Sequence, residues 1–180
     1  MTFDKILEDG RLWAVRYDGE NDNALRNVMA QWNDAEWLVN FFSENIDDLT
    51  SYFHITDIDD AIYRTFDDRD ALECVIMDIS PDANLDKIFR PLENSRIGDM
   101  MLGREKARPR QRSWLRLYAI KLSAGIYVIT GGAIKLTRTM QERQHTLTEL
   151  GKMESVRNFL IDKNIFDDDS FIEYQREVEP

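Results

Sequence analysis

The centre of the chain reads Trp114-Leu-Arg-Leu-Tyr-Ala-Ile-Lys-Leu122, Ser123-Ala-Gly125 and Ile126-Tyr-Val-Ile-Thr-Gly-Gly-Ala-Ile-Lys-Leu-Thr137. Apolar and polar side chains alternate along the first run, and the last run is rich in β-branched and aromatic residues, so both favour strands. The short run between them predicts a turn. Gly131-Gly132 suits either a tight hairpin or a bulge within one bent strand, and the bulge is the interpretation we prefer. The centre of the chain therefore predicts antiparallel strands.

Helices are predicted on both sides of these strands. After a first strand at residues 12–17, residues 24–42 show helical spacing with a break at Asn33-Asp34, where short polar side chains compete for backbone hydrogen bonds. A helical turn follows at 47–49, and residues 57–66 and 67–79 are interpreted as two helices that each begin at an aspartate N-cap. We expect a mobile polar stretch between 93 and 112, a long helix at 141–161, and an acidic tail at 167–180 with one helical turn.

This order of elements predicts the α+β class, with a small antiparallel sheet of three to five strands against which N-terminal helices and a C-terminal helix pack. With 180 residues, 43% of them hydrophobic, the chain is long enough for one domain with a core. We expect a single domain over residues 1–180, made of an acidic helical part (1–85), a basic sheet region (86–140) and a C-terminal helix with an acidic tail (141–180). The predicted core includes several aromatic side chains: Trp13, Trp32, Trp37, Phe41 and Phe42.

Charge is distributed unevenly along the chain. The formal net charge is −11, yet residues 96–145 contain eleven Lys and Arg against three Asp and Glu. Residues 1–95 contain eight against twenty-two, and the residues from 146 onward contain four against nine. We call residues 96–145 the basic island. A positive island in a negative chain indicates a local anionic partner.

The most regular part of the basic island is Lys106, Arg108, Arg110 and Arg112, which alternate with other residues. In an extended segment these side chains would project from one side and match a line of phosphates, so they are candidate nucleic-acid contacts. Two other interpretations remain open at this point. The strip contacts the acidic surface of a partner protein, or the acidic half of the chain itself neutralises it.

The sequence gives no sign of a metal or cofactor site. The two histidines, His54 and His145, lie far apart, and with a single cysteine there is no zinc-binding spacing. Gly131-Gly132 lacks the Lys-Ser/Thr step of a phosphate loop, so we expect no cofactor. Cys74 has no disulfide partner and is predicted to be a small buried side chain. Because no signal-peptide pattern and no apolar run of ~18 residues occur, we expect a cytoplasmic protein without membrane contact.

The residues from Trp114 to Thr137, followed by a helix with Glu149-Leu150, resemble the C-terminal half of RelE/HigB-type toxins of bacterial toxin–antitoxin systems, which include phage-derived relatives. Such proteins have an arginine-bearing strand, then a strand that ends in a Lys-Lys-Thr-x-Lys-Thr-like segment, and then a helix. Upstream, Phe89-Arg-Pro-Leu92 is similar to the Arg-x-Leu turn before their sheet. The resemblance covers about residues 86–150 by motif, and 12–42 by layout.

The resemblance implies a metal-independent endoribonuclease that cleaves messenger RNA, usually on the ribosome. In this chemistry a 2′-hydroxyl attacks the neighbouring phosphate, a base removes its proton, and cations stabilise the developing charge. Arg116 matches the strand arginine, with Tyr118 two residues further on, and Lys135 matches the first lysine of the Lys-Lys-Thr segment.

The chain departs from the family pattern after Lys135. Leu136 stands at the second lysine, and the third falls at Thr139, with Arg138 beside it. His145, just past the strand, is the candidate base. The implied partners are a helix-turn-helix antitoxin and RNA or the ribosome. The alternative function is a non-enzymatic interaction protein on the same scaffold, which binds nucleic acid or protein.

Overall fold

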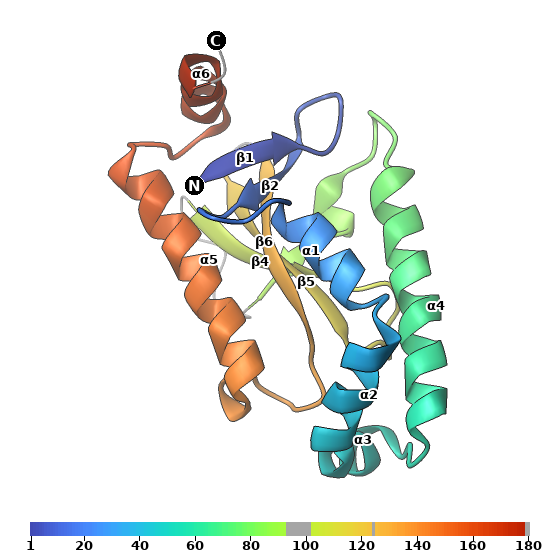
Figure 1. The fold of residues 1–180 in the computed structure, drawn as a ribbon. Coiled ribbons are helices and arrows are strands. Elements are labelled where there is room, and N and C mark those ends of the chain that lie inside the picture. The colour runs from blue at the N-terminus through green and yellow to red at the C-terminus, as the bar shows by residue number, and fades with distance from the viewer. Residues whose placement is uncertain (93–101, 124, 179–180) are drawn as a thin grey trace.

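The computed structural model describes residues 1–92, 102–123 and 125–178, and a mixed sheet of six strands in the order β1-β2-β6-β5-β4-β3 forms its centre (Figure 1). The strands are β1 (Thr2–Lys5), β2 (Leu12–Arg16), β3 (Arg90–Pro91), β4 (Leu102–Ala107), β5 (Leu115–Leu122) and β6 (Tyr127–Ile134). The helices are α1 (Ala24–Gln31), α2 (Ala35–Glu44), α3 (Ile46–Phe53), α4 (Ile58–Met77), α5 (Gln144–Asp162) and α6 (Asp168–Val178), with 3₁₀ turns at Leu85–Lys87 and Met140–Glu142. The predicted α+β class is confirmed.

Strands β5 and β6 form the predicted antiparallel pair, and β6 runs without interruption through both glycines. Tyr118 pairs with Gly131 while Ala119 pairs with Ile129, so Thr130 is the extra residue of a bulge in β6. The bulge that we preferred over a hairpin is therefore confirmed. Bulges of this kind bend a strand and re-aim the side chains beside them.

The sheet is larger than predicted, and it is not purely antiparallel. Strand β6 pairs in parallel with β2. Parallel strands need a long connection, and here the chain between β2 and β6 contains four helices and three other strands. The additional strands are short (β1 and β3) or polar (β4), and such segments give little periodic signal. Part of the stretch predicted to be mobile, residues 102–107, is strand β4, whereas 93–101 lie outside the described residues.

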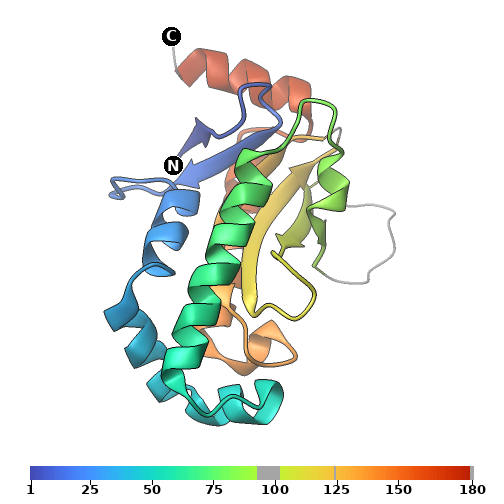
Figure 2. The same cartoon turned by 90° about the vertical axis from the view of Figure 1, so that its right-hand side faces the viewer.

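Helices cover both faces of the sheet. A Cβ atom on Gly131 would lie 2.1 Å from Oε2 of Glu149 on α5, whereas one on Gly132 would lie 2.9 Å from Val28 on α1. Since successive residues of a strand point to opposite faces, α5 and α1 approach the same point of β6 from opposite sides. Figures 1 and 2 show α5 on one face, with α1, α2 and α4 on the other.

The predicted N-terminal helices are present, with one difference. The side chain of Asp34 accepts a hydrogen bond from the backbone N–H of Trp37 at 3.0 Å and begins α2, which confirms the break at residues 33–34. Asp57 caps α4, but the prediction of a second helix starting at Asp67 is wrong. No glycine or proline interrupts residues 58–77, so α4 continues past Asp67, which is exposed.

Two further predictions about side chains and the tail are wrong. Cys74 is exposed because it lies on the side of α4 opposite to Leu72 and Ile76, which face the core. The acidic tail forms an eleven-residue helix, α6, rather than a single turn. Phe171 of α6 is fully buried, with ring centroids 5.4 Å from Phe3 and 5.3 Å from Trp13, and burying such a ring contributes about 1.5–3 kcal/mol.

The aromatic side chains predicted for the core are found there. Trp13, Trp32, Phe41 and Phe42 are buried, and Trp37 is partly buried with its ring stacked on Phe41 at 5.2 Å. Trp32, beside Gly132, and Phe42, whose ring centroid lies 5.6 Å from that of Trp114, join α1 and α2 to the sheet face that α5 leaves free, whereas Trp13 packs against Phe171 of α6. The opposite face, beside α5, carries the polar site.

Candidate functional site

A cavity of about 410 Å³ opens where β4, β5 and the end of β6 meet the start of α5. We call it the cationic pocket. It is lined by Ile88, Arg90, Leu92, Lys106, Arg108, Arg116, Tyr118, Lys135, Arg138, Thr139, Met140, Gln141 and Leu150. Six of the nine site residues predicted from sequence line it: Lys106, Arg108, Arg116, Tyr118, Lys135 and Arg138.

The strand register explains why these residues meet. Lys106 of β4 pairs directly with Tyr118 of β5, so the two side chains lie on the same face of the sheet. Arg116 is two residues before Tyr118 and therefore shares that face. Lys135 follows β6, and its backbone N–H donates to the carbonyl oxygen of Trp114 at 2.8 Å, which holds the lysine next to the start of β5. The pocket is thus built on paired strands.

Backbone carbonyl groups hold the cations of the pocket in place. Arg116 Nη1 donates to the carbonyl oxygens of Ser113 and Leu115 at 2.6 and 2.7 Å. Lys106 Nζ donates to Leu92 O at 3.2 Å, and Arg108 Nη1 to Gln111 O at 2.9 Å.

Lys135 is held in the same way, because its Nζ donates to the carbonyl oxygens of Thr137 and Arg138 at 2.6 and 2.5 Å. Within the part of the chain that the structure describes, none of Lys106, Arg108, Arg116 and Lys135 forms an ion pair with a carboxylate. The positive charge of the pocket is therefore available to an anion from outside.

The cations also act on one another. Burial, and then the charges of Arg116 and Lys106, lower the pKa of Lys135. Burial, and then Arg116 and Arg108, lower the pKa of Lys106. An anion bound among these groups would relieve their repulsion, so the pocket favours phosphate or carboxylate ligands.

Tyr118 contributes a polar group to the floor of the pocket. Its side chain is fully buried, and its hydroxyl has no hydrogen-bond partner among the described residues. Burial raises the pKa of Tyr118, so the hydroxyl keeps its hydrogen at neutral pH. A buried hydroxyl without a partner is costly by about 1–3 kcal/mol, which points to a ligand or solvent partner.

The other three predicted site residues do not line the pocket. Arg110 forms an ion pair with Asp68 of α4, and the backbone carbonyl of Arg112 accepts a hydrogen bond from Arg64 at 2.8 Å. His145 Nε2 lies 2.9 Å from the carbonyl oxygen of Ile134, and its ring packs edge-on against Phe41 of α2 at 5.1 Å. The alternating strip at 106–112 is therefore divided, with only Lys106 and Arg108 at the pocket.

Other residues of the basic island also contact carboxylates that lie outside the island. Arg143 forms two hydrogen bonds of 2.6 Å with the carboxylate of Asp48 on α3. Lys121 Nζ lies 2.5 Å from Asp86 Oδ1. Self-neutralisation, one of the three interpretations of the charge pattern, therefore holds at Arg110, Arg143 and Lys121. It does not hold at the pocket.

Some residues that line the pocket were not among the site residues predicted from sequence. Arg90 and Leu92 belong to the Phe89-Arg-Pro-Leu92 motif, and pairing of Arg90 with Lys106 brings them to the site. Their motif was a usable signal. Met140 and Leu150 come from the 3₁₀ turn and α5, and they form an apolar wall that nothing local in the sequence indicates.

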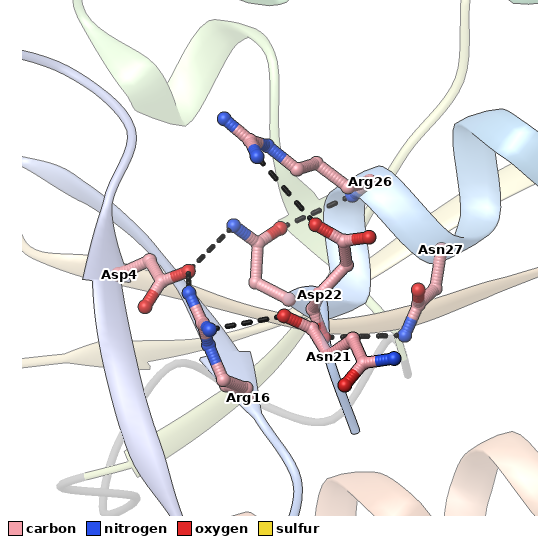
Figure 3. A network of polar contacts seen from close by, with 7 residues as sticks. Asp4, Arg16, Asn21, Asp22, Arg26 and Asn27 are labelled. Atoms are coloured by element: carbon pink, nitrogen blue, oxygen red, sulfur yellow. Dashed lines mark hydrogen bonds and ion pairs between the residues drawn. The ribbon is translucent and has the colours of Figure 1, made fainter.

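A second cavity of about 360 Å³ lies between β1, α1 and the end of α4. Figure 3 shows the polar network beside it, in which Arg16 contacts Asp4 at 2.5 Å and Asn21 O at 3.0 Å. The side-chain amide of Asn23 donates to Asp4 at 2.9 Å, and its side-chain oxygen caps α1 by accepting from the backbone N–H of Arg26. The side chain of Arg26 forms an ion pair with Asp22 at 3.5 Å. Because these charges neutralise one another, the network fixes α1 to the β1–β2 hairpin rather than offering charge to a ligand.

Comparisons of the chain with protein-family models, with curated proteins and with solved structures give no match. Among the described residues, no three His, Cys, Asp or Glu side chains are grouped so that they could hold a metal ion. In the same residues, every helix is too short or too polar to cross a membrane.

Proposed function

We propose that the protein is a metal-independent endoribonuclease of the RelE/HigB toxin type, with the cationic pocket as its active site. The observation that carries the proposal is the convergence of Lys106, Arg108, Arg116 and Lys135 around Tyr118. None of these four cations forms an ion pair with a carboxylate of the described residues. A phosphodiester of messenger RNA is the anion that this proposal assigns to the pocket. The order of β2, the helices that begin with α1 and α2, the arginine-bearing strand β5, strand β6 with Lys135 directly after it, and α5 supports the resemblance drawn from the sequence.

The proposed reaction requires a base, a charge stabiliser and a proton donor. Arg116, Arg108 and Arg138 are assigned to the phosphate, whose negative charge increases as the 2′-oxygen attacks. Lys106 is assigned as the base, because its pKa is lowered by burial and by two arginines and it makes a single, long hydrogen bond. His145, the base predicted from sequence, does not line the pocket. Tyr118 is assigned as donor to the phosphate or the leaving 5′-oxygen.

A cleavage assay on a short single-stranded RNA tests this proposal. We expect cleavage that persists in EDTA and leaves a 2′,3′-cyclic phosphate. Lys106→Ala, Arg116→Ala and Lys135→Ala should each slow it by about 100-fold or more, the range for loss of one acid–base or charge-stabilising group. Arg26→Ala is the matched control, because it removes an equally positive side chain that is 74% exposed and outside the pocket. Intact RNA after prolonged incubation with purified protein would exclude the nuclease.

A non-enzymatic interaction protein on the same scaffold is the second candidate. It is favoured by one observation, that the described pocket lacks a histidine or carboxylate base. This candidate predicts salt-dependent RNA binding that Arg116→Ala weakens, without cleavage. Induced expression in bacteria separates the two, since growth arrest that Lys106→Ala abolishes supports the nuclease.

A further inference from the structure

One wall of the cationic pocket comes from residues 135–142, which connect β6 to α5 and which we call the rim turn. Among the described residues, no backbone–backbone hydrogen bond involves residues 136–138. Backbone N–H and C=O groups normally find partners, so the conformation of this turn depends on hydrogen bonds from side chains. The rim-turn residues that line the pocket are Lys135, Arg138, Thr139, Met140 and Gln141.

Lys135 fixes the first half of the rim turn. Its backbone N–H is bonded to the carbonyl oxygen of Trp114, next to β5, and its Nζ donates to the carbonyl oxygens of Thr137 and Arg138 at 2.6 and 2.5 Å. Hydrogen bonds from a charged donor are roughly twice as strong as neutral ones. An ammonium group has three hydrogens, so the bonds to the turn leave at most one of them for a bound anion.

Glu142 fixes the second half of the rim turn. Its Oε1 accepts hydrogen bonds from the backbone N–H of Thr139 at 2.6 Å and from the hydroxyl of the same residue at 2.8 Å. The turn is then tied to α5, where the Thr146 hydroxyl donates to the carbonyl oxygen of Met140 at 2.6 Å. Glu142 is exposed and lies outside the lining of the pocket, so its contacts serve the turn rather than a ligand.

Arg138 is the cation whose placement depends on these contacts. Its carbonyl oxygen accepts from Lys135, and its exposed side chain forms no hydrogen bond or ion pair with the described residues. Arg116 and Arg108, by contrast, each donate to a backbone carbonyl oxygen, which holds their guanidinium groups directly. The conformation of the rim turn therefore decides whether Arg138 faces the pocket.

We propose that Lys135 and Glu142 are positioning residues that hold the rim turn beside the cationic pocket, and that both act on a bound anion through Arg138. The two side chains carry opposite charges, yet they act in the same direction because each supplies hydrogen bonds to the turn. Direct electrostatics predicts the reverse for Glu142, since a carboxylate repels a nearby anion. The inference rests on the proposed function only in taking the anion to be an RNA phosphate.

Binding of a short single-stranded DNA, oligothymidylate, tests this without cleavage, because DNA has no 2′-hydroxyl to attack. Glu142→Ala should weaken binding by about three- to tenfold, the range for loss of one hydrogen-bonded contact, although it removes a negative charge. Glu142→Gln removes the same charge but keeps the accepting oxygen, so it should bind at least as tightly as wild type. Binding by Glu142→Ala that equals or exceeds that of wild type would overturn the inference.

A double-mutant cycle tests whether Lys135 acts through Arg138. Arg138→Ala and Lys135→Met should each reduce the slope of log affinity against log salt by about 0.7, the value for one phosphate contact on a single strand. The double variant should also lose about 0.7, because no arginine remains to be positioned, whereas two independent phosphate contacts would lose about 1.4 and contradict the inference. Lys163→Met is the matched control, since this lysine is exposed at the C-terminal end of α5, outside the pocket.

Hydrogen exchange in the free protein completes the test. The backbone N–H of Thr139, which donates to Glu142, should exchange about tenfold faster or more in Lys135→Met than in wild type or Lys163→Met. Unchanged exchange at Thr139 would overturn the inference, whether or not the protein binds the probe. RNA cleavage and probe binding that Glu142→Ala leaves unchanged would refute the inference and keep the nuclease. The predicted binding pattern without RNA cleavage would do the reverse.

Discussion

Replacing Arg110 with alanine tests how the basic island is divided. The ion pair joins a fully buried carboxylate, Asp68, to an arginine whose side chain is 54% exposed. Removing one partner of a fully buried pair costs about 3–5 kcal/mol, whereas exposed pairs contribute about 0.2–1 kcal/mol. Because this pair has one buried and one exposed member, we expect Arg110→Ala to lower the free energy of unfolding by about 2 kcal/mol.

For a chain of this length a loss of 2 kcal/mol lowers the melting temperature by about 4–8 °C. Urea unfolding at pH 7 measures it directly.

Two companion variants make the test specific. The free energy of unfolding of Arg112→Ala should lie within about 0.5 kcal/mol of that of wild type. The hydrogen bond at Arg112 is made by its backbone carbonyl oxygen, and its side chain is exposed. Asp68→Asn combined with Arg110→Ala should recover part of the loss, since the buried charge is gone. If Arg110→Ala unfolds like wild type, or the double variant is no more stable than the single one, Asp68 does not depend on Arg110 and the division of the island is wrong.

Three other outcomes follow from the geometry. Gly131→Ala should lower the free energy of unfolding in urea by about 1–3 kcal/mol, because the new Cβ atom would meet the Glu149 carboxyl. Gly151→Ala on α5, which has open space around it, should raise the free energy of unfolding by about 0.5–1 kcal/mol. Equal effects of the two substitutions would contradict this reasoning. Burial raises the pKa of Glu149 in the folded protein. The stabilising contribution of the neutral Glu149 side chain is therefore fully present below the unfolded-state pKa of about 4.3, and it declines as the pH rises toward the folded-state pKa. The stability of Glu149→Gln should thus increase relative to wild type between pH 4 and 7, and a constant difference in unfolding midpoints would refute this. Arg116→Ala should reduce the slope of log affinity against log salt for single-stranded RNA by about 0.7, and an unchanged slope in fluorescence titrations would remove Arg116 from the phosphate contacts.

Much of the secondary structure was predictable because its periodicity is local. The alternation at 114–122 predicted β5, the glycine pair predicted a bulge, and Asp34 marked the start of α2. Strand direction was not predictable in this way, since the parallel pairing of β2 with β6 depends on the path of the helices between them. Strand β1 was missed because its four residues are too few to show a period.

The site was predictable in part for a related reason. Charge alternation and family-like motifs identified Lys106, Arg116 and Lys135, whose side chains meet through strand pairing. Which cation faces the pocket is decided by partners distant in sequence. Arg110 contacts a carboxylate 42 residues away and Arg143 one that is 95 residues away, so no local pattern separates them from Arg108.

The parallel pairing of β2 with β6 also bears on how the chain reaches its fold. Leu12 pairs with Tyr127, more than a hundred residues further along, whereas β4, β5, β6 and α5 follow one another closely. Loop-closure entropy makes such distant pairing slow compared with the formation of neighbouring strands. We therefore expect the C-terminal meander and α5 to form early, and docking of the β1–β2 hairpin to limit the folding rate. The pocket would then be assembled before the N-terminal part of the sheet is complete.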